Sequence, residues 1–143
     1  MTILRTISLV AAALSVLCTP AWAEKADRDK PMLIEADAMR HDENKLLTHF
    51  TGKVVAFKGT MVLRGDRMEV QQDKNGQQVA HVWAAPNERV FFRQKREGVD
   101  EFTEGEGEMV IYDSQADVVT LVQRAELRIL RGTVLADQIT GQK

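Results

Sequence analysis

The chain has 143 residues, of which 44% are hydrophobic and 28% are charged, and its formal net charge at pH 7 is −2. This length is sufficient for one domain with its own hydrophobic core. The near balance of acidic and basic residues argues against a dedicated nucleic-acid-binding protein, because such proteins concentrate positive charge on the face that meets phosphates.

Residues 1–23 have the three parts of a cleavable secretory signal peptide. Arg5 gives a positive start, an apolar run of about 11 residues follows, and Ala21-Trp22-Ala23 is a small-x-small cleavage site. The run is too short to span a membrane, which takes about 20 residues. One alternative is a lipoprotein anchored through Cys18, which the preceding Leu17 disfavours; another is a cytosolic protein with an apolar first helix. Export with loss of the single cysteine is therefore expected.

The remainder of the chain is predicted to be one domain of short strands over residues 31–143. Residues 24–30 are charged, so we expect a flexible leader before it. A strand begins at Met32, and further strands are predicted at 46–50, 54–57, 61–64 and 67–71, with Gly-containing turns or bulges at 51–52, 58–59 and 65–66. Residues 73–76, which end in Asn-Gly, predict a tight hairpin turn.

The second half continues with strands at 77–84 and 90–93, followed by a polar stretch at 94–100 that is expected to be an exposed loop. Residues 101–108 are acidic and rich in glycine, but they lack the ligand spacing of a calcium-binding loop. We interpret them as a solvated edge strand whose charges discourage pairing with other chains. No stretch sustains helical apolar spacing over three turns, so the sequence predicts a nearly all-β domain.

The first half of the domain recurs in the second. Asp42 corresponds to Asp113, Gly59-Thr60 to Gly132-Thr133, and Asp66 to Asp137. A repeated supersecondary unit indicates neighbouring units that bury a shared core. Both glycines are expected to adopt a backbone conformation that a β-carbon disfavours. A repeating wall also favours a non-enzymatic function, because catalytic groups usually gather in one irregular site.

Few residues in the sequence suggest catalysis or metal binding. His41, His49 and His81 form neither an HxH nor an HExxH pattern, and no cysteine remains after cleavage to complete a zinc site. Ser114 is the only serine of the mature chain, and no GxSxG motif surrounds it. We therefore predict a protein that is not an enzyme, with no catalytic residue, no bound metal and no cofactor.

Apolar side chains on alternate strand positions are the main functional clue, as in Met68 and Val70 or Leu127 and Ile129. They form either a dry core between two sheets or, if the sheets splay apart, an apolar trough for acyl chains. Periodicity alone favours the plain core. The candidate lining residues are Met32, Ile34, Met61, Leu63, Met68, Val70, Val90, Phe92, Val110, Tyr112, Leu127 and Ile129.

Five segments carry recognisable patterns in a fixed order: Pro31–Asp37 (PMLIEAD), Thr51–Ala56 (TGKVVA), Gly59–Met68 (GTMVLRGDRM), Phe92–Gln94 (FRQ) and Gly107–Asp113 (GEMVIYD). They resemble the P-I-x-I-E-(S/A)-D, F-x-G-N-V-x-V, Q-G-x-x-x-(I/L)-x-A-D-x-(V/M), F-R-Q and A-x-x-(I/M)-x-Y-(D/E) segments of the LptA/OstA family, whose members are periplasmic carriers of lipopolysaccharide. The resemblance covers essentially the whole mature chain.

This resemblance implies a fold, a ligand and partners. The fold is an LptA/OstA-like β-jellyroll of stacked antiparallel strands with an open, V-shaped apolar interior. The ligand is lipopolysaccharide, whose acyl chains the interior holds. The partners are further copies of the chain stacked end to end, an LptC-like inner-membrane component and an LptD-like outer-membrane component, with no nucleic acid. Strands near 32–36 and 133–139 are expected to be the docking edges.

The sequence departs from the family pattern in two places. Gln123 and Arg124 stand where the family has a Thr-Gly pair, so a different turn is expected there. The sequence ends at Lys143, where many members continue with further strands, which predicts an incomplete C-terminal docking edge.

Three functions follow from these observations. The first is a periplasmic lipid-transport bridge. The second is a structural adaptor with a closed core, which docks by strand augmentation without binding lipid. The third, a secreted carbohydrate-active or lytic enzyme, is supported only by the signal peptide and the β content. Uptake of lipopolysaccharide or of a hydrophobic dye separates the first two, and turnover would reveal the third.

Overall fold

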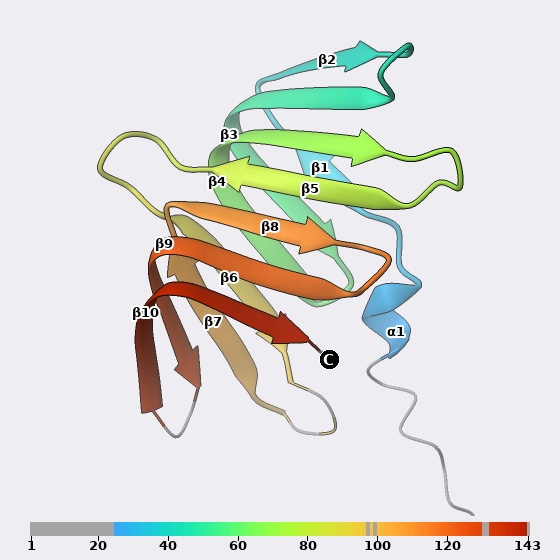
Figure 1. Cartoon of the computed structure of the whole chain (residues 1–143). Coiled ribbons are helices and arrows are strands. Elements are labelled where there is room, and N and C mark those ends of the chain that lie inside the picture. Colours follow the sequence, from blue (N-terminus) through green and yellow to red (C-terminus); the bar gives the residue numbers. More distant parts are fainter. Residues whose placement is uncertain (1–24, 97, 99, 130–131, 143) are drawn as a thin grey trace, which may run out of the picture.

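The computed structural model describes residues 25–142 except 97, 99, 130 and 131, so the predicted signal peptide lies outside the described residues. The predicted all-β fold is confirmed (Figure 1). No helix among the described residues has the length and apolar character needed to cross a membrane. The elements in chain order are α1 (Lys25–Arg28), β1 (Leu33–Glu35), β2 (Ala38–Asp42), β3 (Leu47–Lys58), β4 (Met61–Gln72), β5 (Gln78–Trp83), β6 (Val90–Lys95), β7 (Phe102–Gly107), β8 (Met109–Asp113), β9 (Val118–Ile129) and β10 (Gly132–Gln142).

The antiparallel pairings form one continuous ten-stranded sheet that folds over on itself into two facing layers, which we call the β5–β8 sheet and the β6–β7 sheet after one pair in each. β2 belongs to the first sheet and β1 to the second. The long strands β3, β4, β9 and β10 belong to both, because one half of each pairs in one sheet and the other half in the other. These long strands therefore join the two sheets along one side of the molecule.

Each long strand passes from one sheet to the other at an irregularity, and we call this joined side the corner. The register of β3 against β4 shifts between Thr51 and Val54, and that of β10 against β9 shifts between Ala136 and Gln138. Extra residues of this kind bend a strand and increase its twist. Short strands follow the same path, since β1 leads into β2, β5 into β6 and β7 into β8 around the corner (Figure 1). The opposite side, where turns connect the strands, is the open side.

The repeat seen in the sequence is also a repeat of structure. β3 begins at residue 47 and β9 at residue 118, 71 residues later, and both have 12 residues. β3 pairs with β1, β2 and β4, and β9 pairs in the same way with β7, β8 and β10. Asp42 and Asp113 close equivalent turns, because Oδ1 of each accepts two backbone N–H bonds, at 3.0 and 3.1 Å and at 2.9 and 3.1 Å. Both units contribute to one buried cluster, as the repeat predicts.

The different turn expected at residues 123–124 is not found. Gln123 has φ 59° where Gly52 of the first unit has φ 78°, and the following residue has φ 46° in both units. The carbonyl oxygen of Gly52 accepts a bond from the N–H of Asp37 at 2.9 Å, and that of Gln123 accepts one from Glu108 at 3.0 Å. The surrounding pairing therefore fixes the corner, and Gln123 holds a left-handed conformation that glycine adopts without strain.

Gly59 and Gly132 are not structurally equivalent, which corrects the correspondence drawn from the sequence. Gly59 lies in the β3–β4 turn with φ 57°, the left-handed conformation that was predicted. Gly132 begins β10 with φ 158°, a value that residues with a β-carbon also rarely adopt, as predicted, although a Cβ built there would meet no atom within 4 Å. β4 begins at Met61 and β10 at Gly132, 71 residues later. When the two units are aligned on their structures, Gly59 and Gly132 therefore occupy positions that differ by two residues.

The acidic, glycine-rich strand β7 is not an edge strand, contrary to expectation. It pairs with β6 on one side and with β9 on the other. Gly105 and Gly107 are buried, whereas Glu104 and Glu106 are partly exposed and form ion pairs. A Cβ built on Gly105 would lie 2.6 Å from Cδ1 of Leu121, so β7 closely approaches its neighbours. The Glu-Gly alternation is thus a period-two strand pattern in which glycine is the inward residue.

Two of the predicted strand breaks bend a strand without ending it. Residues 51–52 and 65–66 lie inside the continuous strands β3 and β4. The hairpin turn predicted at 73–76 is confirmed, with the N–H of Asp73 donating to the carbonyl oxygen of Gln77 at 2.9 Å. β6 extends to Lys95, into the stretch that was expected to be a loop.

Part of the expected flexible leader takes a defined place in the structure. Residues 25–28 form one helical turn, and Asp27 is only 8% exposed. The charged composition of this segment gave no sign that one of its carboxylates is buried.

Candidate functional site

Alternate strand residues point into the space between the two sheets and form the candidate site. Among the predicted lining residues, those near the centre are 0–6% exposed and belong to one cluster: Met61, Leu63, Met68, Val70, Val90, Phe92, Val110 and Tyr112. The structure thus brings these side chains together on the inner face. Their role in binding stays a prediction.

The other four predicted residues are less buried. Met32, Ile34 and Leu127 are partly buried and pack against the cluster. Ile129, the last residue of β9, is also partly buried. Met32 and Ile34 lie at the β1 end of the sandwich, so the apolar face extends from its middle towards that end.

Sequence reasoning missed several buried residues of the same cluster: Val54, Ala56, Ala80, Val82, Leu121 and Ala125. Three of them are alanines, which a search for large apolar side chains passes over. The available signal was again the period of two, because residues 54 and 56, and residues 80 and 82, alternate along their strands.

A buried tyrosine brings a polar group to the inner face. The side chain of Tyr112 is 1% exposed, and its hydroxyl donates to Oδ1 of Asp117 at 3.3 Å. Burial raises the pKa of Tyr112 far above its ordinary value, and the Asp117 carboxylate raises it further. The phenol therefore stays neutral and acts as a hydrogen-bond donor at the edge of the cluster.

The outer face of the β6–β7 sheet carries a network of ion pairs. Nη1 of Arg128 lies 3.2 Å from Glu106 and 2.9 Å from Glu126. Arg89 reaches the same two carboxylates at 2.7 and 3.3 Å. The hydrogen bond from Arg128 lowers the pKa of Glu126, and that same bond raises the pKa of Arg128. Opposite charges are balanced here, so this face is not the basic surface that nucleic-acid binding needs.

Guanidinium groups also stack on aromatic rings of the outer faces. The Cζ atom of Arg64 lies 4.4 Å from the ring centre of Phe91, and that of Arg67 lies 4.2 Å from the ring centre of Trp83. Contacts of this kind are cation–π interactions. Phe91 therefore faces outward while its neighbour Phe92 faces the interior.

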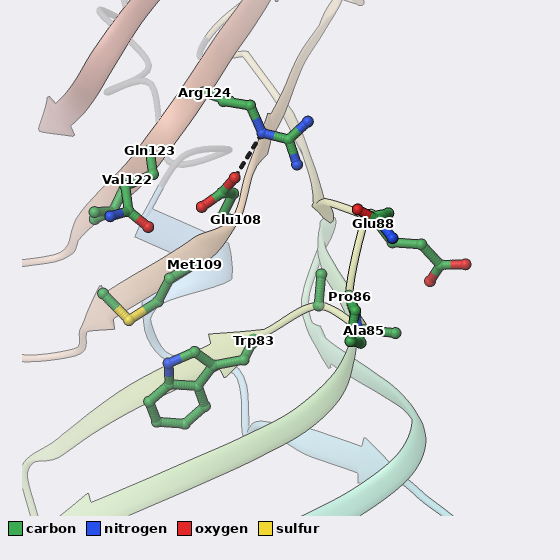
Figure 2. A pocket seen from close by; sticks show the side chains of 11 residues that line it. Trp83, Ala85, Pro86, Glu88, Glu108, Met109, Val122, Gln123 and Arg124 are labelled. Atoms are coloured by element: carbon green, nitrogen blue, oxygen red, sulfur yellow. Dashed lines mark hydrogen bonds and ion pairs between the residues drawn. The ribbon is translucent and has the colours of Figure 1, made fainter.

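A separate pocket lies at the corner, between the β5–β6 connection and the β8–β9 pair (Figure 2). Its cavity has a volume of about 480 Å³. Trp83 and Met109 are among its apolar lining residues, and on its β8–β9 side Nε of Arg124 donates to Oε1 of Glu108 at 2.6 Å. None of the twelve predicted lining residues borders this pocket, so it is distinct from the candidate site.

The histidines take part in local contacts. Nδ1 of His41 lies 2.8 Å from Oγ1 of Thr48, and Nδ1 of His49 lies 3.3 Å from a carboxylate oxygen of Glu69. His81 stacks on the indole ring of Trp83. In the part of the chain that the structure describes, no group of three or more His, Cys, Asp or Glu side chains is placed to hold a metal ion.

The stack of strands ends in free backbone edges. Among the described strands, β1 and β2 each pair only with β3, and β10 pairs only with β9. Large apolar side chains are exposed on these end strands: Leu33 and Met39 are 61% and 67% exposed, and Val134 and Leu135 are 51% and 73% exposed. Unpaired strand edges with apolar side chains are typical sites for adding a further strand.

Comparison with known proteins gives consistent matches. The chain is 27% identical to the lipopolysaccharide export system protein LptA of Escherichia coli (strain K12) over 134 residues, which cover 92% of this chain and 70% of that protein. It is 26% identical to the LptA of Haemophilus influenzae, over 92% of this chain and 76% of that protein.

The fold is also similar to that of a solved structure. LptH of Pseudomonas aeruginosa, described as the LptA-homologous periplasmic component of a lipopolysaccharide transport device, superposes with a TM-score of 0.76 at 24% identity, over 82% of this chain and 79% of that chain. This likeness supports the LptA-like jellyroll. The family model for LptA/(LptD N-terminal domain) LPS transport proteins matches residues 33–143, most of the chain, and the chain therefore belongs to this family.

Proposed function

We propose that this chain is a periplasmic bridge protein that binds lipopolysaccharide and carries it from an inner-membrane transport complex to an outer-membrane translocon. The observation that carries the proposal is the family match over residues 33–143 on a sandwich with a continuous apolar inner face. The names of the relatives support the cargo, and the description of LptH as periplasmic supports the location. The predicted signal peptide agrees with that location.

The lipid site in this proposal is the inner face, lined by the twelve predicted residues. Acyl chains gain about 0.8 kcal/mol for each CH₂ group that they bury, so about ten buried methylenes contribute about 8 kcal/mol before the cost of association is subtracted. Met61 and Met68 lie in the middle of the face, and the flexible thioether of methionine adapts to disordered ligands. No catalytic residue is needed for this role.

Lipid entry requires the two sheets to part, because the central residues are 0–6% exposed. The fold favours parting on the open side, since the long strands join the sheets only at the corner. The strand ladders run within each sheet, so they persist when the open side widens.

The free edges support the proposed partners. β1 and β2 would add strands of an LptC-like component or of another copy, and β10 would add strands of another copy or of an LptD-like component. The exposed Met39 and Leu135 would become buried in such junctions. Head-to-tail contacts of this kind give open assemblies.

The alternative is a structural adaptor that docks through the same edges and never binds lipid. Burial of the central inner-face residues favours it, because a dry core already satisfies them. The two proposals share the fold and the partners, so the test has to report on the interior.

A photo-crosslinking amino acid at two adjacent positions provides that test. Phe92 faces the interior and Phe91 lies under Arg64 on the outer face, so the pair matches in size, strand and sequence position. Lipopolysaccharide should crosslink to the protein labelled at position 92 and not to the protein labelled at position 91. Equal labelling at both positions would indicate surface adsorption. A folded protein that crosslinks at neither position would support the adaptor.

A further inference from the structure

The short segment of residues 25–30 lies on the open side of the sandwich and contacts both sheets. Figure 1 shows α1 beside the turns on this side. One group of contacts is with the β3–β4 turn and with β6, at the rim of the β6–β7 sheet. The other is with the β8–β9 turn, at the rim of the β5–β8 sheet. The segment therefore bridges the two rims.

Asp27 attaches the segment to the rim of the β6–β7 sheet. Its carboxylate accepts a bond from the backbone N–H of Thr60 at 2.9 Å, another from the hydroxyl of Thr60, and a third from Nε2 of Gln94 at 3.3 Å. Asp27 and Gln94 are 8% and 9% exposed. Nζ of Lys58 also donates to the carbonyl oxygen of Arg28 at 2.8 Å. Charge-assisted bonds to a buried carboxylate make this the firm attachment.

Arg28 attaches the segment to the rim of the β5–β8 sheet. Its guanidinium donates to the carbonyl oxygen of Gln115 at 3.3 Å, and both residues are exposed. Gln115 belongs to the turn that carries Asp117, the partner of the inward-facing Tyr112. The charge of Arg28 acts on Tyr112 and partly offsets the rise of its pKa. The contact therefore lies at the edge of the apolar interior, and it is the weaker of the two.

These contacts limit how far the rims can separate. Any separation must break the bond between Arg28 and Gln115 or lift Asp27 out of its buried position. The exposed bond is the easier one to break, so the segment should open from the β5–β8 sheet and stay attached to the β6–β7 sheet.

We propose that residues 25–30 form a strap that holds the open side closed and that its release admits lipid acyl chains sideways into the interior. The proposal rests on the lipid-binding function proposed above. The strap is thus a conformational control on entry, placed on the segment that leads directly into the end strand β1.

The first measurement follows the rims and needs no lipid. Spin labels at Lys74→Cys and Asp100→Cys, in a Cys18→Ser background, report the distance between the β4–β5 turn and the β6–β7 loop, one on each rim. In the Asp27→Ala variant the distance distribution should broaden and shift to longer values. Asp29→Ala removes an exposed carboxylate from the same segment and should leave the distribution unchanged. An unchanged distribution in Asp27→Ala would overturn the strap.

A matched pair of glycine variants displaces the strap without touching its residues. A Cβ built on Gly59 would lie 2.7 Å from Cγ and 2.9 Å from Cα of Asp27, whereas one built on Gly76 would meet nothing closer than 3.7 Å. Both glycines have positive φ, 57° and 81°, so alanine causes similar backbone strain at each. Gly59→Ala should therefore reproduce the distances of Asp27→Ala, and Gly76→Ala should resemble the parent. Parent-like distances in Gly59→Ala would contradict the strap.

The second measurement follows purified lipopolysaccharide with the photo-crosslinker at position 92. If the open state is a minor one near 10%, Asp27→Ala should increase the crosslinking rate about tenfold. A short bis-maleimide across Arg28→Cys and Gln115→Cys, again in the Cys18→Ser background, should suppress crosslinking relative to the same variant left unbridged. Equal crosslinking with and without the bridge would overturn the strap alone. An absence of crosslinks in every variant would overturn the proposed lipid-binding function. It would then also overturn the proposal that release of the strap admits lipid.

Discussion

Replacing Gly105 with alanine tests whether β7 is an inner strand in close contact with its neighbours. Gly105 is buried, and a Cβ built on it would lie 2.6 Å from Cδ1 of Leu121, itself 2% exposed, and 3.4 Å from the carbonyl oxygen of Glu126. Leu121 would have to move within a packed cluster. Gly141 on β10 is the matched control, because it is exposed and a Cβ there would meet nothing within 4 Å.

The steric effect should be measurable against this control. Overpacking by one methyl group typically destabilises a core by about 1–3 kcal/mol. Alanine in place of glycine in a strand contributes about 0.5–1 kcal/mol of stability at both sites, through reduced backbone entropy. The two variants should therefore differ by about 1–3 kcal/mol in the free energy of unfolding, measured by urea denaturation with unchanged slope. Equal stability of Gly105→Ala and Gly141→Ala would refute the close approach.

A double-mutant cycle with Leu121→Ala identifies the cause. Leu121→Ala alone should destabilise by about 2–5 kcal/mol through a cavity. In that background the methyl group of Gly105→Ala has space, so its effect should become smaller, with a coupling of at least about 0.5 kcal/mol. Strictly additive effects would show that Gly105→Ala acts through something other than contact with Leu121.

Two further predictions concern the outer surface and the end strand. The hydrogen bond from Arg128 lowers the pKa of Glu126, so this interaction stabilises the folded state above the ordinary carboxyl pKa, about 4.3 in unfolded chains, and is lost as the pH falls through the depressed value. Glu126→Gln should flatten the loss of Tm below about pH 4.3, and parallel Tm curves for variant and parent would contradict this. Leu135→Gln, at a site 73% exposed on β10, should leave Tm unchanged while reducing concentration-dependent association in light scattering; the uncharged amide avoids repulsion with Glu126, its partner on β9. Unchanged association would argue against docking through β10.

The inner face was predictable from the sequence wherever polarity alternates strongly. Met68 and Val70 alternate with polar neighbours, and both are buried as that pattern predicts. The repeat was detectable because Asp42 and Asp113 close equivalent turns through their side chains, which requires the same residue type twice. Local rules suffice for such features, because the side chains that form the buried face or close the turn also produce the pattern that is visible in the sequence.

Features that depend on distant contacts were not predictable in this way. Gly105 faces inward because Leu121 occupies the space that a side chain would need, and no local pattern encodes that contact. Gln123 adopts a left-handed backbone conformation at the corner because the strand pairing on both sides of it fixes the backbone, although glutamine rarely adopts this conformation. Asp27 is held in its buried position by hydrogen bonds from Thr60, which is 33 residues away in the sequence. In each case tertiary structure overrides the local preference.

The architecture also bears on how a closed core and a lipid carrier can be the same molecule. The hydrogen-bonded ladders run along each sheet and around the corner, so parting the open side breaks no ladder between neighbouring strands. What is lost is apolar contact across the interior, about 25 cal/mol for each Å² that separates. An acyl chain that enters replaces this contact with one of the same kind, so the cost of parting the sheets is largely recovered and the gain that remains comes from the apolar surface of the acyl chain itself. Exchange on such a surface is reversible, as a carrier requires. A closed interior without lipid is therefore the resting form expected of a bridge, and the strap variants and the pair at positions 91 and 92 report whether it opens.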